Sequence, residues 1–277
     1  GIITKYRYNA STNTWEIVEV TLPIGVVTVQ ADRYPFLQNI PTNFLVIGPN
    51  NFLYRYDEAL MSWLATPLVV DPCILAKSLE QTQSLKDKMS DLQSKTGLNY
   101  ETGYTMKRNI DGSITYTGIN GTPNAGGIDF SPSSAIDGYI HTHYTGLLSI
   151  FSPDDMRALY TLMNNNLMGN PSNFTAGVVT ASGTSYLLMI NDIQQFQVFS
   201  QSFLSNENSF NIFSTLYSEV YNIKPSNTVD QNETSLLQLL QVTNSGLKLL
   251  KGNTGVFDDW KVLGLDQNNS VTSTDCN

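Results

Sequence analysis

The two histidines of the chain lie two residues apart, at His141 and His143, within the segment 138–144. This segment alternates like a β-strand, and residues i and i+2 of a strand point to the same face. The two imidazoles can therefore converge on one ion. Asp155 follows twelve residues later, in the first turn of a predicted helix, where it would add an anionic ligand. Two imidazoles and one carboxylate, with a fourth position open to water, are typical of a catalytic zinc site.

The same residues also allow a purely structural interpretation. Two histidines on one strand can be polar side chains without a ligand, and Ser152 with Asp155 can be a helix cap and its capping partner. Short patterns of this kind are common by chance. The acidic residue Glu101 upstream and the Ser-x-x-Asp spacing downstream favour the metal site over this alternative.

Together these residues resemble the signature of the JAMM, or MPN-type, metallopeptidases, which is a glutamate on an early strand, then His-x-His, then Ser-x-x-Asp at the start of a helix. The matching residues are Glu101, His141, His143, Ser152 and Asp155. The sequence around them is especially similar to bacterial JAB-type domains of secreted or mobile-element proteins. The resemblance covers the stretch from residue 72 to residue 200.

The resemblance implies an α/β fold with a mixed β-sheet flanked by helices, related to that of the cytidine deaminases. It implies a zinc-dependent peptidase or isopeptidase whose substrate is a peptide or a protein. The implied zinc ligands are His141, His143 and Asp155. Glu101 would be the general base and proton shuttle, and Ser152 would stabilise the oxyanion, because a carboxylate can move the water proton and a hydroxyl can stabilise developing charge.

The loop before the predicted helix differs from the family pattern at two points. The stretch from His143 to Ser152 is one residue longer, and Tyr144 stands where the family has a proline. One added residue changes the closure entropy of a loop very little. The insertion leaves Asp154 as an alternative ligand, but Asp155 has the expected offset from the serine, so we predict Asp155.

Two further glutamates are alternatives to Glu101 as the general base. Glu80 and Glu58 also lie upstream of the histidines, in helical or boundary sequence. Glu101 instead precedes a predicted strand that can pair beside the strand 138–144, which would bring its carboxylate to the histidines. We therefore predict Glu101.

The elements that must position these residues are visible in the sequence. Polarity alternation and turn residues predict one hairpin over 101–108 and 113–118, and a second over 174–180 and 185–190. A serine followed by a proline predicts the start of a helix at 152–153. The predicted hairpins and helix flank the strand that carries the histidines.

The remaining segments include the clearest helix of the chain. A single long helix is predicted over 72–92, with Asp71 as its cap. After 193 the chain is predicted to be mainly helical to about 242. The segments 247–251 and 260–265 are predicted to be short and irregular.

The chain is predicted to contain two domains. Residues 1–70 would form a small β-rich domain, and residues 71–277 would form the JAMM-like metallohydrolase domain with a helical C-terminal extension. The strands predicted in the first domain are 5–8, 14–20, 44–47 and 52–56.

Composition excludes several classes of function. The chain has 24 acidic and 15 basic residues, a net charge of −9, and no long basic run, so nucleic acid is not expected as a partner. No stretch approaches the roughly 18 apolar residues of a membrane span. Charged residues make up 14% of the chain, below the roughly 25% of ordinary soluble domains, and neutral polar residues replace them. This composition favours an extracytoplasmic protein, either periplasmic, cell-surface or secreted.

The two cysteines, Cys73 and Cys276, are too few for a tetrathiolate zinc site. They form either one long-range disulfide or two unrelated thiols.

Besides the hydrolase, a second function is consistent with the sequence. The chain would then be a surface-exposed binding or interaction protein whose JAMM-like metal site is inactive or structural.

Overall fold

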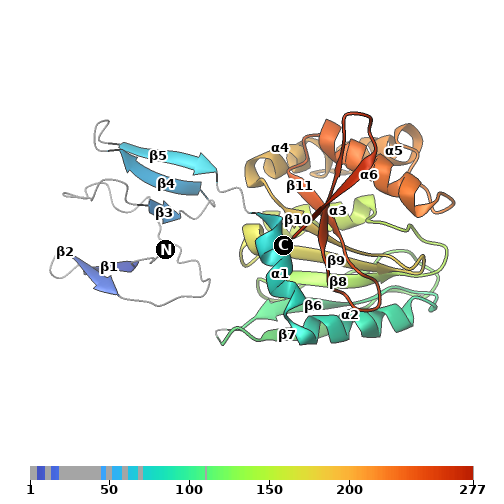
Figure 1. Ribbon diagram of the computed structural model, residues 1–277, viewed down its shortest axis with the longest axis horizontal. Coiled ribbons are helices and arrows are strands. Elements are labelled where there is room, and N and C mark those ends of the chain that lie inside the picture. Colours follow the sequence, from blue (N-terminus) through green and yellow to red (C-terminus); the bar gives the residue numbers. More distant parts are fainter. Residues whose placement is uncertain are drawn as a thin grey trace. The chain divides into compact units, whose positions relative to one another are not determined.

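The computed structural model describes residues 71–109 and 111–276 with their side chains, and the backbone of five strands nearer the N-terminus. The chain divides into two compact units, Gly1–Thr66 and Pro67–Asn277 (Figure 1). The larger unit contains all the residues of the predicted metal site.

The smaller unit contains antiparallel strands. Strands β1 (Lys5–Asn9) and β2 (Thr14–Val18) form a two-stranded sheet. A three-stranded sheet has the order β3 (Leu45–Ile47), β4 (Phe52–Asp57) and β5 (Ser62–Pro67). The four strands predicted in this part of the chain are confirmed. Strand β5 was not predicted, and it ends on a proline, a residue that argues against a strand when only the sequence is read.

The larger unit is built on one eight-stranded sheet with the order β13-β12-β11-β10-β9-β8-β6-β7. Its strands are β6 (Thr102–Arg108), β7 (Ile114–Asn120), β8 (Gly138–His143), β9 (Thr175–Thr180), β10 (Ser185–Ile190), β11 (Leu247–Lys251), β12 (Lys261–Leu265) and β13 (Val271–Asp275). Neighbouring strands are antiparallel except for β8 and β9, which are parallel. The sheet is therefore mixed, and the predicted α/β class is confirmed.

Helices cover both faces of this sheet (Figure 1). Their bounds are α1 (Pro72–Glu80), α2 (Gln83–Lys95), α3 (Pro153–Asn164), α4 (Ile193–Phe203), α5 (Glu207–Thr215) and α6 (Val229–Val242), with a π-helix, η3 (Leu216–Val220), directly after α5 and a short 3-10 helix, η2 (Pro171–Asn173). Helices α1 and α2 pack on one face, and α3 to α6 contribute to the core on the other. Within the described part of the chain, none of these helices has the length and apolar character needed to cross a membrane.

The prediction of one long helix over 72–92 was wrong, because the chain breaks between α1 and α2. Thr82 has an extended backbone, with φ −92° and ψ 96°, and stands at the N-cap position of α2. Its hydroxyl donates to the carbonyl of Ser78 at 2.9 Å, while its N–H donates to Leu79 instead. A hydroxyl thus takes the carbonyl that the next helical N–H would have used, which is how threonine competes with helical backbone.

The prediction that 247–251 and 260–265 are irregular was also wrong. These segments are strands β11 and β12, and with β13 they extend the sheet beyond β10. Strand β11 pairs with β10, so that Leu249 lies opposite Leu188, 61 positions earlier in the chain. A strand of five residues stabilised by such a distant partner has little local signal.

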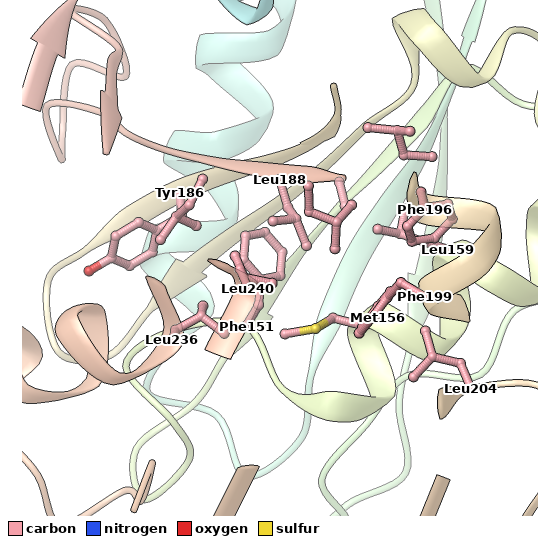
Figure 2. Packing of buried hydrophobic residues seen from close by; sticks show 14 of the residues in the cluster. Phe151, Met156, Leu159, Tyr186, Leu188, Phe196, Phe199, Leu204, Leu236 and Leu240 are labelled. Atoms are coloured by element: carbon pink, nitrogen blue, oxygen red, sulfur yellow. The ribbon is translucent and has the colours of Figure 1, made fainter. Parts of the chain in front are cut away.

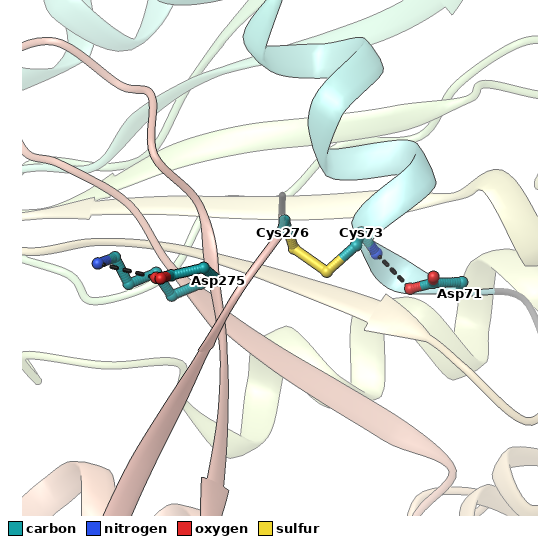
Figure 3. Close-up of a disulfide and its surroundings, with 5 residues drawn as sticks. Asp71, Cys73, Asp275 and Cys276 are labelled. Carbon is teal, nitrogen blue, oxygen red and sulfur yellow. Dashed lines mark hydrogen bonds and ion pairs between the residues drawn. A yellow bond between two sulfur atoms is a disulfide. The ribbon is translucent and has the colours of Figure 1, made fainter.

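The disulfide between Cys73 and Cys276 joins the first turn of α1 to the residue after β13 (Figure 3). Of the two alternatives that the sequence leaves open for these cysteines, the structure contains the bridge. Its cysteines are 203 residues apart in the sequence. Each end is fixed locally, because Asp71 accepts a hydrogen bond from the N–H of Cys73 at 2.9 Å and Asp275 pairs with Lys261 at 3.0 Å. The bridge therefore closes almost the whole larger unit into one covalent loop.

The core between the sheet and helices α3 to α6 fixes the helix that carries Asp155. Met156 and Leu159 of α3 are fully buried, and they pack with aromatic residues such as Phe151 and Phe196 (Figure 2). Because Met156 and Leu159 lie in the first two turns of α3, this packing fixes the start of the helix, where Asp155 lies.

Candidate metal centre

Both histidines lie on β8, inside the sheet between β6 and β9. Every residue of β8 is buried, and the exposed fractions of His141 and His143 are 0% and 3%. As the strand alternation predicted, the two side chains share one face and meet each other. Their Nε2 atoms are 3.3 Å apart.

Backbone carbonyls fix the orientation of both imidazole rings. Nδ1 of His141 lies 3.0 Å from the carbonyl oxygen of Gly177 on β9, and Nδ1 of His143 lies 3.0 Å from that of Leu148. Since a carbonyl can only accept, each Nδ1 carries a hydrogen, and in a neutral ring Nε2 is left with a lone pair. This arrangement is characteristic of metal-binding histidines, whose second ring nitrogen donates to a carbonyl or carboxylate.

Asp155 completes the contact between the strand and the following helix. Its Oδ1 lies 3.0 Å from Nε2 of His141, and its Oδ2 lies 3.4 Å from Nε2 of His143. The side chain is held by a capping box, because Oδ2 accepts hydrogen bonds from the N–H of Ser152 at 2.7 Å and from its hydroxyl at 2.9 Å. The cap and the contact with the histidines therefore use the same carboxylate.

The electrostatics of this group show strong mutual attraction. Burial disfavours the charged form of Asp155, but His141 and His143 outweigh it and hold the pKa of this carboxyl well below its ordinary value. Burial also disfavours the charged form of His141, yet Asp155 raises the pKa of this imidazole above its ordinary value. The carboxylate thus attracts positive charge to the point between the two rings.

The donor set fits a divalent cation. The two Nε2 atoms and the two oxygens of Asp155 are all acceptors when the rings are neutral, and they converge in a buried space. Buried acceptors with no positive partner between them repel one another, so this arrangement requires a bound proton or a metal ion. Two imidazole nitrogens with a carboxylate are ligands that suit zinc and related transition metals.

Glu101 supplies a second carboxylate beside the histidines. It precedes β6, whose Gly103 lies opposite His141 in an antiparallel register, and its own exposed fraction is 3%. One ligand atom each from Glu101, His141 and His143 lies within 4.8 Å of the others, so these three residues could hold a metal ion. Oε1 of Glu101 accepts a hydrogen bond from the N–H of Gly127 at 3.0 Å, which orients the carboxylate.

The remaining predicted residues lie around this centre. The hydroxyl of Ser152 donates to Asp155 and accepts from its N–H at 3.2 Å, so it lies next to the metal ligands within the capping box. The alternative ligand Asp154 is exposed, whereas Asp155 reaches both imidazoles. Of the alternative bases, Glu80 ends α1 on the opposite face of the sheet, and Glu58 lies outside the described residues.

Several groups that position the centre were not found from the sequence. The carbonyls of Gly177 and Leu148 and the N–H of Gly127 are backbone atoms, which any residue type supplies. The buried hydroxyl of Tyr139 donates to the carbonyl of Asp155 at 3.0 Å. Its position two residues before His141 on the same strand was the available signal, because it places the ring on the same face.

The chain matches no family model, no curated protein and no solved structure. The resemblance to JAMM/MPN-type metallopeptidases therefore depends on the glutamate, the His-x-His pair and the Ser-x-x-Asp pair, whose positions are given above. The chemistry of the centre follows from these side chains and their contacts.

Proposed function

We propose that the larger unit is a zinc-dependent peptidase or isopeptidase of the JAMM/MPN type, which hydrolyses an amide bond in a peptide or protein. The convergence of the Nε2 atoms of both histidines and the carboxylate of a buried aspartate, at distances of 3.0 to 3.4 Å, is the observation that carries the proposal. A buried glutamate, Glu101, has a carboxylate oxygen within 4.8 Å of a ring nitrogen of each histidine, and it supplies the acid–base group that hydrolysis requires.

In this proposal His141, His143 and Asp155 hold the zinc ion. When bound there, zinc lowers the pKa of a coordinated water molecule and polarises the substrate carbonyl. Asp155 also neutralises part of the charge that enters the buried site. The carbonyls that accept from the two Nδ1 atoms keep both rings in the tautomer that presents Nε2.

Glu101 is the proposed general base. Its carboxylate accepts a proton from the attacking water and passes it to the nitrogen of the leaving amine when the carbon–nitrogen bond breaks. The hydrogen bond from Gly127 to Oε1 restricts rotation of this carboxylate, and in this proposal Oε2 is the oxygen that transfers the proton. Ser152 lies beside Asp155, and for its proposed role its hydroxyl turns from the carboxylate to the oxyanion of the substrate.

We propose an extracytoplasmic location for this activity. The disulfide between Cys73 and Cys276 supports it, because stable disulfides are typical of secreted, periplasmic and cell-surface proteins. The low fraction of charged residues is consistent with the same location.

Replacing each of two neighbouring aspartates by asparagine tests whether Asp155 is a metal ligand. Asp155→Asn removes the carboxylate that contacts both imidazoles, whereas Asp154→Asn removes the charge of the exposed neighbouring residue. We expect purified parent protein and Asp154→Asn to contain one zinc ion per chain by mass spectrometry of the metal content, and Asp155→Asn to contain far less. Equal zinc contents in the two variants, or no zinc in the parent protein, would exclude the proposed centre.

A second pair of variants tests whether the centre is catalytic. We expect Glu101→Gln to keep its zinc and to lose about 10²- to 10⁴-fold in the rate of hydrolysis of peptide and lysine isopeptide libraries, which is the usual contribution of a general base. Glu80→Gln, on the opposite face of the sheet, is the matched control and should retain the parent rate. If the parent protein binds zinc but cleaves nothing in these libraries, the centre is structural, as in a binding or interaction protein.

A further inference from the structure

The loop between β8 and α3 determines the position of two donors of the proposed metal centre. The carbonyl of Leu148 accepts from Nδ1 of His143 and fixes the angle of that ring. Ser152, at the other end of the loop, caps α3 and binds the carboxylate of Asp155. A displacement of residues 148–152 would therefore change the ring angle of His143 and the position of Asp155 relative to His141, whose ring is oriented separately by the carbonyl of Gly177 on β9.

Three buried side chains hold this loop from outside. The hydroxyl of Tyr217 donates to the carbonyl of Phe151 at 2.8 Å. Nδ2 of Asn232 donates to the hydroxyl of Ser149 at 3.0 Å, across 83 residues of sequence. The hydroxyl of Thr184 donates to the carbonyl of Ser149, also at 3.0 Å. Tyr217 and Asn232 lie beyond residue 200, outside the stretch that resembles the metallopeptidases.

The side-chain amide of Asn232 is buried and fully hydrogen-bonded. Its exposed fraction is 0%, and its Nδ2 makes a second hydrogen bond, to the carbonyl of Lys224 at 3.0 Å. Its Oδ1 accepts from the N–H of Lys224 at 3.2 Å and from Nδ2 of Asn227 at 3.1 Å. A side-chain amide has two donor and two acceptor sites, and here all four are used. The amide therefore links the loop to α6 and to the segment before it in one geometry.

Tyr217 is placed by an unusual backbone. It lies in the π-helix η3, where the N–H of Tyr221 donates to the carbonyl of Leu216 at 3.0 Å. A π-type turn contains one more residue than an α-helical turn, and such turns are concentrated at functional sites. The exposed fraction of Tyr217 is 2%, and its ring is part of the core on the histidine face.

We infer that Tyr217 and Asn232 are positioning residues of the metal centre, and that η3 and α6 belong to the site because they hold the loop that carries His143's carbonyl partner and the cap of Asp155. This inference rests on the proposed zinc site. The hydrogen bonds that connect them to the site go to the carbonyl of Phe151 and the hydroxyl of Ser149, so each acts through the loop.

Two substitutions that each remove one hydroxyl group test the inference. Tyr217→Phe removes the hydroxyl that holds Phe151, and Ser149→Ala removes the acceptor of Asn232 while all other bonds of the amide remain possible. Tyr104→Phe is the matched control, since it also deletes a tyrosine hydroxyl with a strong partner, Asp91 at 2.6 Å, but on the opposite face of the sheet. All proteins are compared at a temperature where circular dichroism shows them to be folded.

Zinc affinity is measured by competition with a chromophoric chelator, and the ligand geometry by the visible absorption spectrum of the cobalt(II) form. We expect Tyr217→Phe and Ser149→Ala each to bind zinc about tenfold more weakly, within the range known for outer partners of metal ligands, and to change the cobalt spectrum. Tyr104→Phe should match the parent protein in both measurements.

The outcomes separate this inference from the proposed function. If the parent protein binds zinc and cobalt and both loop variants match it in affinity and spectrum, the positioning role is wrong while the metal centre stands. If the parent protein binds neither ion, the proposal of a metal centre is wrong, and the inferred positioning role is then wrong as well. If Tyr217→Phe does not fold, Ser149→Ala decides between the first two results.

Discussion

The two faces of the eight-stranded sheet bury different kinds of side chain, although the same strands supply both. On β8, His141 and His143 point to the face covered by α3 to α6, while Ile140 and Thr142 point to the face covered by α1 and α2. The buried polar and charged residues of the first face include Ser149, Asp155, Asn232 and Glu233. The core of the second face is mainly apolar, and its largest buried side chain is Trp260.

The two faces therefore differ in role: one carries the proposed metal centre, and the other stabilises the fold. Buried polar groups are tolerated only when they are hydrogen-bonded, so the histidine face needs a network of precise contacts. The opposite face is held mainly by close apolar packing, and it also carries the disulfide that ties α1 to the end of β13. Substitutions on the first face should therefore change metal binding and hydrolysis, and substitutions on the second should change stability.

The sharpest test of this separation uses two adjacent residues of β8. We expect His141→Ala to reduce zinc affinity by more than about a hundredfold and to abolish hydrolysis, since even the outer partners of metal ligands contribute about 10- to 100-fold. Thr142→Val changes the other face, where the threonine hydroxyl accepts from the N–H of Thr102 at 2.9 Å. It should lower the free energy of unfolding by about 1 to 3 kcal/mol, because a buried donor loses its partner. Chelator competition and urea unfolding measure the two effects, and equal zinc affinities in both variants would contradict the separation.

Removal of the disulfide should affect stability without affecting the centre. We expect Cys73→Ala combined with Cys276→Ala to lower the free energy of unfolding by about 2 to 5 kcal/mol, because the bridge constrains a long loop in the unfolded chain. Urea unfolding at equal zinc saturation measures the loss. The zinc affinity of the folded variant should equal that of the parent protein, and a weaker affinity would show that the packing of α1 reaches the histidines.

Glycine substitutions in neighbouring strands test how closely β6 must approach β8. An alanine Cβ at Gly103 would lie 2.6 Å from the carbonyl oxygen of Ile140 and 3.1 Å from Cβ of His141. We expect Gly103→Ala to lower the free energy of unfolding by about 1 to 3 kcal/mol, as overpacking does, and to weaken zinc binding. Gly118→Ala on β7 is the control, because its nearest neighbour, an atom of the Tyr104 ring, is 3.7 Å away. Comparable thermal unfolding of the two variants would show that the strands can separate at no cost.

The parts of the fold that were predicted correctly have local signals. The hairpin of β6 and β7 follows from alternation around a turn, and the start of α3 follows from Ser152 and Pro153. The same serine and Asp155 form the predicted capping box, so the structural interpretation of these residues and the metal interpretation are both compatible with the geometry. The candidate site could be assembled because its residues lie in such locally determined elements.

The parts that were missed depend on distant partners. Strands β11 and β12 are short, and each forms on the edge of a strand that precedes it in the chain, because β11 pairs with β10 and β12 pairs with β11. At the break after α1 a threonine hydroxyl binds the carbonyl of Ser78, and a threonine is equally compatible with a continuous helix when only its residue type is known. The contact between Asn232 and Ser149 spans 83 residues, and nothing in the spacing of the sequence marks it.

The smallest expected effect concerns the face covered by α1 and α2, where half-exposed side chains of α2 and β6 form a polar cluster. Burial opposes ionisation of Asp91, but hydrogen bonds from Lys95 at 2.6 Å and from Tyr104 at 2.6 Å outweigh it and hold the pKa of Asp91 below its ordinary value. The stabilisation from Asp91 is therefore fully present above the pKa that this carboxyl has in the unfolded chain, about 3.9. It is lost as the pH falls through the lower pKa that Asp91 has in the folded protein.

Tyr104→Phe removes one of the two donors, so we expect the pKa of Asp91 to rise in a carbon-detected NMR titration of its carboxyl group. Because Asp91 and Lys95 are more than a third exposed, solvent screens the pair, and the stability lost at neutral pH should stay below about 1 kcal/mol. The zinc affinity should not change, since the hydroxyl lies on the face opposite His141. A weaker affinity in this variant would mean that a polar contact on the supporting face is transmitted through the sheet, and the two faces would then not be separable.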